Sequence, residues 1–104
     1  MELYKIIISR HAQKDEEEIL RYIARELKEP EIAIKQIDRI DEGILSLSEM
    51  PQRNPIIRDH TYSGQPTRKL IVDNYIIFYA ILEKRKLVRI LRVFYNRRDW
   101  INLL

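Results

Sequence analysis

The chain has 104 residues, of which 45% are hydrophobic and 34% are charged. This composition excludes a disordered chain and predicts one folded domain over residues 1–104. There is no cysteine, which excludes disulfides, a thiol nucleophile and thiolate metal sites. The apolar run at residues 3–8 is too short for a signal peptide, and no later run has membrane-spanning length. We therefore expect a cytoplasmic protein without a membrane partner.

The net charge of +3 is divided unevenly along the chain. Residues 11–49 contain six Lys or Arg and eleven Asp or Glu, whereas residues 67–104 contain nine Lys or Arg and three acids. An acidic half joined to a basic half predicts a polyanion or an acidic protein as the partner.

The first half of the sequence predicts a strand followed by two helices. Residues 3–9 form a short, β-branched apolar run that ends at Ser9, a suitable helix N-cap. The acidic residues 15–18 suit the first turns of one helix, and Pro30 suits the first turn of another. Each helix has an apolar stripe, formed by Ile19, Leu20, Tyr22, Ile23 and Leu27 and by Ala33, Ile37, Ile40, Ile44 and Leu47. The two helices should form an antiparallel hairpin.

The second half predicts a sheet. Met50 and Pro51 end the second helix, and the stretch from there to Pro66 contains three prolines and Gly64, so we expect a loop. Residues 68–73, 75–83 and 86–95 have the pattern of strands joined by tight turns, and residues 97–104 that of a short helical turn. With the opening strand joining by a crossover, the predicted class is α+β. The helical hairpin then packs on one face of a small, mostly antiparallel sheet.

Metal and cofactor sites are not expected. His11 and His60 lie far apart in the sequence and neither has a second ligand at helical spacing, so we interpret both as surface or loop residues. Gly43 and Gly64 are the two glycines of the chain, which excludes a glycine-rich phosphate loop and gives no support to a nucleotide cofactor. No serine is set in a nucleophile-elbow pattern.

The basic sheet is the candidate functional region. Cations on it, with tyrosines among them, offer charge pairing with phosphates beside rings for base stacking, as RNA binding requires. The candidate substrate-binding residues are Arg68, Lys69 and Arg89, with Arg92 nearby and Tyr75, Tyr79 and Tyr95 as the rings. The alternative for each tyrosine is packing in the core, because strand propensity alone favours tyrosine.

RNA cleavage without a metal requires a base for the 2′-hydroxyl, cations for the phosphate and a donor to the leaving oxygen. The candidate catalytic residues are Tyr95, as a base activated by neighbouring cations, and Arg97 and Arg98. The alternative for the two arginines is a solvated chain end with an ion pair to Asp99, which contributes at most about 1 kcal/mol.

Several segments taken together resemble the RelE/ParE superfamily of bacterial toxins from type II toxin–antitoxin modules. They are residues 15–24, 47–51, 68–70, 74–79 and 90–100, after the opening strand. Their order and spacing carry the resemblance, which covers nearly the whole chain. It implies the α+β fold described above, a cognate antitoxin as partner and a toxin–antitoxin hetero-oligomer.

The superfamily has two main activities, ribosome-dependent mRNA cleavage in RelE-like members and poisoning of DNA gyrase in ParE-like members. The RelE-like pattern implies roles for Lys69 in a basic strand and for Arg97 or Arg98 as the late arginine. Ile76, however, stands where that pattern has an arginine, and many relatives carry histidine where Tyr95 stands.

The long acidic first helix, with its pattern at residues 15–24, looks more ParE-like. The resemblance therefore implies a growth-arresting toxin, with a slight preference for DNA gyrase over ribosome-bound mRNA as the target. The mRNA endonuclease is the second interpretation. A plain basic nucleic-acid-binding module is the third.

Overall fold

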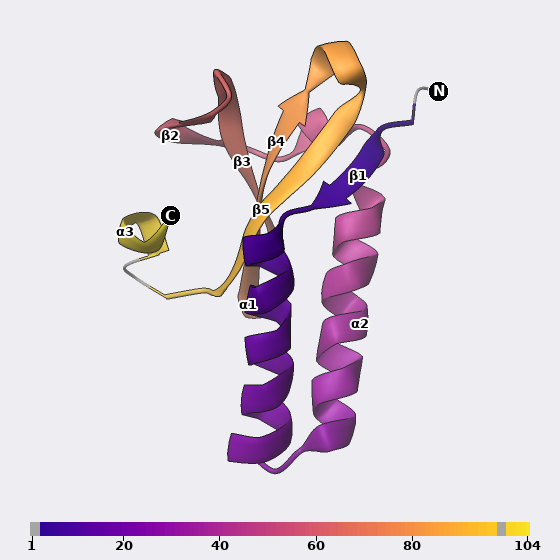
Figure 1. Ribbon diagram of the computed structural model, residues 1–104, viewed down its shortest axis with the longest axis vertical. Helices are drawn as coiled ribbons and strands as arrows, with labels where there is room; N and C mark the ends of the chain where they lie inside the picture. Colours follow the sequence, from indigo (N-terminus) through magenta and orange to yellow (C-terminus); the bar gives the residue numbers. More distant parts are fainter. Residues whose placement is uncertain (1–2, 98–99) are drawn as a thin grey trace.

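The computed structural model describes residues 3–97 and 100–104 (Figure 1). Strand β1 (Lys5–Ile8) leads into α1 (Arg10–Arg21), which continues as a π-helical turn at 22–26, and α2 (Pro30–Ser46) follows. After a short 3-10 turn come the remaining strands and the last helix: β2 (Ile56–Tyr62), β3 (Gln65–Val72), β4 (Tyr75–Leu82), β5 (Leu87–Tyr95) and α3 (Trp100–Leu103). No helix in the described part of the chain has the length and apolar character needed to cross a bilayer.

The five strands form one mixed sheet in the order β1-β5-β4-β3-β2. Strand β1 is parallel to β5, and the other neighbouring pairs are antiparallel. The chain passes from one edge of the sheet to the other through α1 and α2, which lie side by side and extend beyond the sheet (Figure 1). The predicted α+β class, the crossover and the helical hairpin are confirmed.

The hairpin begins where the sequence indicated. The Ser9 side chain accepts a hydrogen bond from the backbone N–H of Ala12 at 3.0 Å, so Ser9 is the N-cap of α1. The seam of α2 is confirmed, since Ala33, Ile40, Ile44 and Leu47 are buried and Ile37 is partly buried.

Two expectations for the first helix are wrong. Helix α1 starts at Arg10, so its first turn contains no acid, and residues 15–18 lie further along. The apolar stripe expected on this helix includes neighbours in sequence, such as Ile19 and Leu20 or Tyr22 and Ile23. Adjacent residues of a helix point in different directions, so the stripe cannot lie on a single helix face. Ile23 is buried and Ile19 is partly buried, whereas Leu20, Tyr22 and Leu27 are exposed.

The loop expected before Pro66 is also wrong, because it contains a whole strand. Strand β2 pairs antiparallel with β3, with an irregularity between Ile56 and Thr61. Asp59, Ser63 and Gly64 have positive φ angles of 60°, 50° and 78°, a conformation typical of bulges and tight turns. The prolines flank β2: Pro51 begins the 3-10 turn before it, Pro55 directly precedes it, and Pro66 is the second residue of β3, while Gly64 lies in the turn between the two strands.

Strand β4 is buried on both sides, and the sheet has a core on each face. We call the side covered by α1 and α2 the hairpin face; Tyr75, Ile77 and Tyr79 pack there with the apolar residues of the hairpin. We call the other side the reverse face; Ile76 and Phe78 pack there. The smaller core is completed by Ile57, Leu91, Phe94, Trp100 and Leu104.

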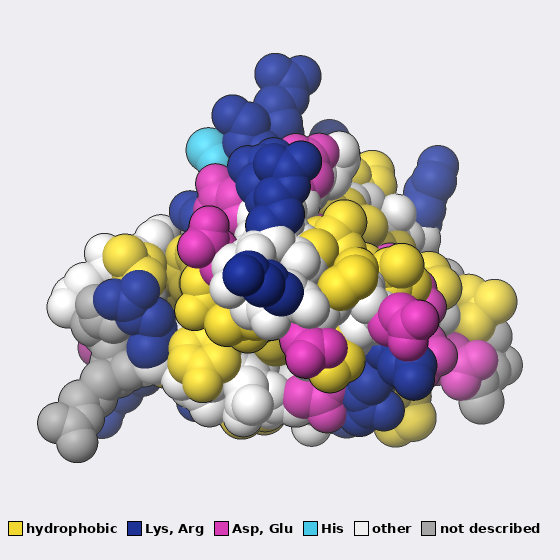
Figure 2. Space-filling model, turned by 90° about the horizontal axis from the view of Figure 1, so that it is seen from below, with side chains coloured by type: hydrophobic (Ala, Val, Ile, Leu, Met, Phe, Trp, Pro, Cys, Tyr) yellow, Lys and Arg dark blue, Asp and Glu magenta, His cyan; other side chains and the backbone are white. Residues whose placement is uncertain are grey.

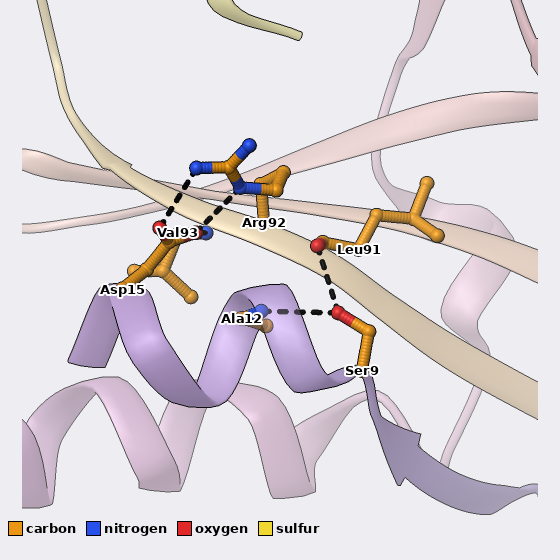
Figure 3. A network of polar contacts seen from close by, with 6 residues as sticks. All are labelled: Ser9, Ala12, Asp15, Leu91, Arg92 and Val93. Carbon is orange, nitrogen blue, oxygen red and sulfur yellow. Dashed lines mark hydrogen bonds and ion pairs between the residues drawn. The ribbon is translucent and has the colours of Figure 1, made fainter. Parts of the chain in front are cut away.

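A bulge changes the course of β5. Phe78 lies opposite Arg92 while the next residue, Tyr79, lies opposite Ile90, so Leu91 is the extra residue. The parallel pairing with β1 ends at Ile90. Beyond the bulge, no described strand covers the outer edge of β5, and α1 lies beside it (Figure 3).

Candidate functional site

The sheet separates the residues that the sequence predicted to act together. Tyr95 lies opposite Tyr75, and the two rings meet edge to face with centroids 5.6 Å apart, so Tyr95 belongs to the hairpin face. Lys69 lies opposite Phe78, and Arg89 lies opposite Ala80. Both residues therefore belong to the reverse face, because residues paired across strands share a side of the sheet.

On the hairpin face, Tyr95 borders a groove between the helical hairpin and the end of β5. Its volume is about 980 Å³. Apolar side chains are unusually exposed along it: Tyr22 (55%), Leu27 (53%), Ile32 (53%) and Tyr95 (55%). Seen from the end of the hairpin, hydrophobic side chains gather around its tip among charged ones (Figure 2). Such a surface can bind an apolar segment of another protein.

The two candidate catalytic arginines are placed only in part. Arg97 lines the groove with Tyr95, and its carbonyl accepts the backbone N–H of Trp100 at 3.3 Å. Arg98 and its neighbour Asp99 lie outside the described residues. The structure thus brings Tyr95 and Arg97 together at the groove, away from Lys69 and Arg89.

A buried carboxylate, Asp15, is among the residues that line the groove, and Figure 3 shows it turned from α1 toward β5. Asp15 accepts the backbone N–H of Val93 at 2.9 Å and two hydrogen bonds from the Arg92 guanidinium, at 2.8 and 2.9 Å. These hydrogen bonds are the main reason why the pKa of Arg92 is raised above its ordinary value. Ser9 acts similarly at the bulge, where its hydroxyl donates to the Leu91 carbonyl at 2.9 Å. Arg92 is therefore paired with a carboxylate, contrary to its expected role as a phosphate contact.

Arg68 and the buried tyrosines have structural roles. The Arg68 guanidinium donates to the carbonyls of Gln52 and Asn54, at 3.0 and 2.7 Å, and so holds the segment that leads into β2. Tyr79 is fully buried and donates its hydroxyl to the Pro51 carbonyl at 2.7 Å. Burial raises the pKa of both Tyr75 and Tyr79. Packing in the core, the alternative for these two tyrosines, is confirmed.

The reverse face carries cations that rest on aromatic rings. The ammonium of Lys69 lies 5.3 Å from the centre of the Trp100 ring, and the guanidinium carbon of Arg89 lies 5.9 Å from that of Tyr62. Arg92 reaches the same face, 4.5 Å from the Phe94 ring. Ile76, at the position of the missing arginine, is buried beside Phe78. The reverse face therefore has an apolar centre at Ile76 and Phe78, and its Lys and Arg side chains lie at the periphery, each against an aromatic ring.

Sequence reasoning missed two residues on this face, His60 and Tyr62. His60 Nδ1 lies 2.8 Å from the hydroxyl of Thr67, which is fully buried, and Tyr62 lies under Arg89. Both residues fall in the stretch before Pro66 for which the sequence predicts a loop. The two-residue spacing of His60 and Tyr62, between Asp59, Thr61 and Ser63, is the signal in the sequence, because alternate residues of a strand share a face.

The described residues contain no group of three or more metal-ligating side chains. His11 is exposed on α1, and the ring of His60 is held by Thr67. The described surface offers two regions to a partner: the apolar groove on the hairpin face and the cationic, aromatic reverse face.

Comparison with known proteins adds the family. The family model described as "ParE toxin of type II toxin-antitoxin system, parDE" matches residues 6–100. No curated protein sequence is significantly similar to the chain.

Solved structures with the same fold include chains from two toxin–antitoxin systems and a toxin in the free state. A chain of the chromosomal ParDE system from Pseudomonas aeruginosa is 21% identical, with a TM-score of 0.73, over 91% of this chain and 98% of that one. A chain of the RelBE2 toxin–antitoxin complex from Mycobacterium tuberculosis is 24% identical, with a TM-score of 0.62, over 95% and 97%. A mutant of the Escherichia coli toxin RelE is 12% identical, with a TM-score of 0.62, over 97% and 92%.

Proposed function

The chain belongs to the family of ParE toxins of type II toxin–antitoxin systems, and on this basis we propose that it arrests growth by poisoning DNA gyrase in the cytoplasm. The observation that carries this choice of target is the separation of Tyr95 from Lys69 and Arg89 by the sheet. Metal-free RNA cleavage requires a base and phosphate-binding cations within reach of one phosphate. A toxin that acts by binding a protein does not need that arrangement.

We assign the groove on the hairpin face to the antitoxin. Its exposed rings and aliphatic side chains, among them Tyr22, Leu27 and Ile32, form a surface that a partner segment can bury as it folds on binding. The structural relatives from P. aeruginosa and M. tuberculosis come from a ParDE system and a RelBE complex. This origin supports a toxin–antitoxin hetero-oligomer for this chain as well.

Cleavage of ribosome-bound mRNA is the second candidate. One observation favours it: Lys69 and Arg89 lie on one face of the sheet, each beside an aromatic ring, which suits an RNA strand. Under this alternative, Tyr95 and Arg97 do not act on the same phosphate as Lys69 in the arrangement described.

The first prediction concerns the order of events after the chain is induced in a bacterial host. We expect growth arrest with early loss of DNA synthesis and a DNA-damage response, while transcripts stay intact and protein synthesis continues at first. Pulse labelling of DNA and protein, with transcript integrity followed in the same cultures, measures this order. Co-expression of the antitoxin encoded beside the toxin should restore growth.

Early transcript cleavage with arrested translation would contradict gyrase poisoning and support the second candidate. Unchanged growth on induction of the intact chain would contradict the toxin function itself. A strain expressing a chain truncated within β4 is the control for the burden of expression, because loss of a strand buried on both sides abolishes the fold.

A further inference from the structure

Besides Lys69, the reverse face carries a cluster of polar side chains at the end of the sheet near the β2–β3 turn. Across the strands, Thr67 lies opposite Ala80, and Ala80 lies opposite Arg89. His60 meets this row through its hydrogen bond to Thr67. His60 and Arg89 thus stand on either side of a floor formed by Thr67 and Ala80, which are fully buried.

Both polar side chains are held in place. One ring nitrogen of His60 is engaged with the buried Thr67 hydroxyl at 2.8 Å, and among the described residues the other nitrogen has no hydrogen-bond partner. The Arg89 guanidinium is held over the Tyr62 ring, and both residues are half-buried. Side chains fixed in this way lose little conformational freedom when they bind a ligand.

The cluster is not neutralised by acids. In the described part of the chain, no carboxylate pairs with His60, Lys69 or Arg89, whereas Arg39 and Arg92 pair with Asp73 and Asp15. Asp59, which precedes His60 on β2, is exposed and forms no ion pair with Lys69 or Arg89. The free donors of this face are therefore available to an anion.

We propose that His60 and Arg89, with Lys69 beside them, form a binding site for the phosphate backbone of a nucleic acid. A row of cations set among Tyr62 and Trp100 fits a chain of phosphates with bases attached better than an isolated small anion. The site lies on the face opposite the groove, so a bound nucleic acid and an antitoxin do not compete for the same surface. The proposal is independent of whether gyrase is the target.

Fluorescence anisotropy of the full-length chain with short labelled DNA and RNA oligonucleotides tests the site. The intact chain should bind, and Arg89→Ala and His60→Ala should each weaken binding about tenfold. The slope of log affinity against log salt should fall by about one for Arg89→Ala, because one phosphate contact is lost. Arg89→Lys keeps the charge and should recover part of the affinity.

The matched control is Arg25→Ala, which removes the same charge from an exposed position on the hairpin. It should change affinity less than about twofold. An equal loss in this control, or unchanged binding by both site variants, overturns the proposal, as does a failure of the intact chain to bind any oligonucleotide. Thermal unfolding of each variant separates loss of the site from loss of the fold. Tighter binding of the DNA oligonucleotides points to DNA at the target, and tighter binding of the RNA oligonucleotides points to mRNA.

Discussion

Asp15 is the residue that joins the first helix to the outer edge of β5. A strand edge presents unpaired backbone groups, and here the carboxylate takes the Val93 N–H where β1 no longer covers it. The same carboxylate neutralises Arg92. One buried side chain therefore satisfies the backbone and removes one cation from the set available to an external anion.

Replacing Asp15 should destabilise the fold. Asp15→Ala leaves the buried Val93 N–H and the Arg92 guanidinium without their partner, so we expect a loss of about 2–4 kcal/mol in the free energy of unfolding. Urea denaturation measures it. Glu17→Ala, an exposed acid of the same helix, is the control and should cost no more than about 0.5 kcal/mol. Equal stabilities of the two variants would show that the Asp15 contacts contribute nothing net.

The two helices of the hairpin meet at a pair of carboxyl groups. Glu16 of α1 and Asp41 of α2 share a hydrogen bond, and both border a small groove with Ile8, Leu20 and Ile37. Burial, with the hydrogen bond and the negative charge of Asp41 added, raises the pKa of Glu16 from 4.5 to about 8. At neutral pH the contact between the helices therefore retains a proton.

This pair predicts that stability falls as pH rises. Between 4.5 and about 8, the folded chain keeps a proton at Glu16 that the unfolded chain has lost, so raising the pH favours unfolding. The loss should be on the order of 1–2 kcal/mol, reduced by solvent screening because Glu16 is only half-buried. Urea denaturation at a series of pH values measures it.

Glu16→Gln should remove this pH dependence and stabilise the fold at the alkaline end of the range. Glu17→Gln, at the next and exposed position, is the matched control and should leave the dependence intact. A slope that survives Glu16→Gln would assign the effect to another group.

At the scale of the whole molecule, the sheet divides the surface into two regions of different character. The hairpin face ends in an apolar groove with Tyr95 and Arg97, and the reverse face carries cations on rings. A partner that covers one region leaves the other accessible. Variants of the two regions should therefore have separable effects.

The groove can be tested with two isoleucines of α2 that differ mainly in position. Ile32 and Ile34 are 53% and 57% exposed, and only Ile32 borders the groove. We expect Ile32→Glu to weaken antitoxin binding at least about tenfold, because it places a charge in an apolar interface. Ile34→Glu should bind the antitoxin as the unchanged chain does. Titration calorimetry with the purified antitoxin measures both, and equal affinities would exclude the groove as the antitoxin site.

Local sequence patterns determined much of the fold. The Ser9 cap, Pro30 at the start of α2, the seam of α2 and the tight turn at Asp73 depend on residues close together in the chain, and the structure confirms them. Strand β2 was missed because Pro55, Gly64 and Pro66, which flank it, signal a loop locally, while pairing with β3 stabilises the strand. Pairing of this kind is a contact between segments, which periodicity within one segment does not report.

The residue types of the site could be read from the sequence, but not how they group. The sequence alone indicates Lys69, Arg89, Tyr95 and Arg97 as candidates, yet which of them share a face depends on strand register and on the bulge at Leu91. A shift of one residue moves a side chain to the other side of a sheet. The sequence by itself thus determined the fold class and the family resemblance, through local propensity and the order of segments. Only the tertiary structure decided that Tyr95 faces the groove, that Arg92 is paired with Asp15, and that His60 and Arg89 share the reverse face.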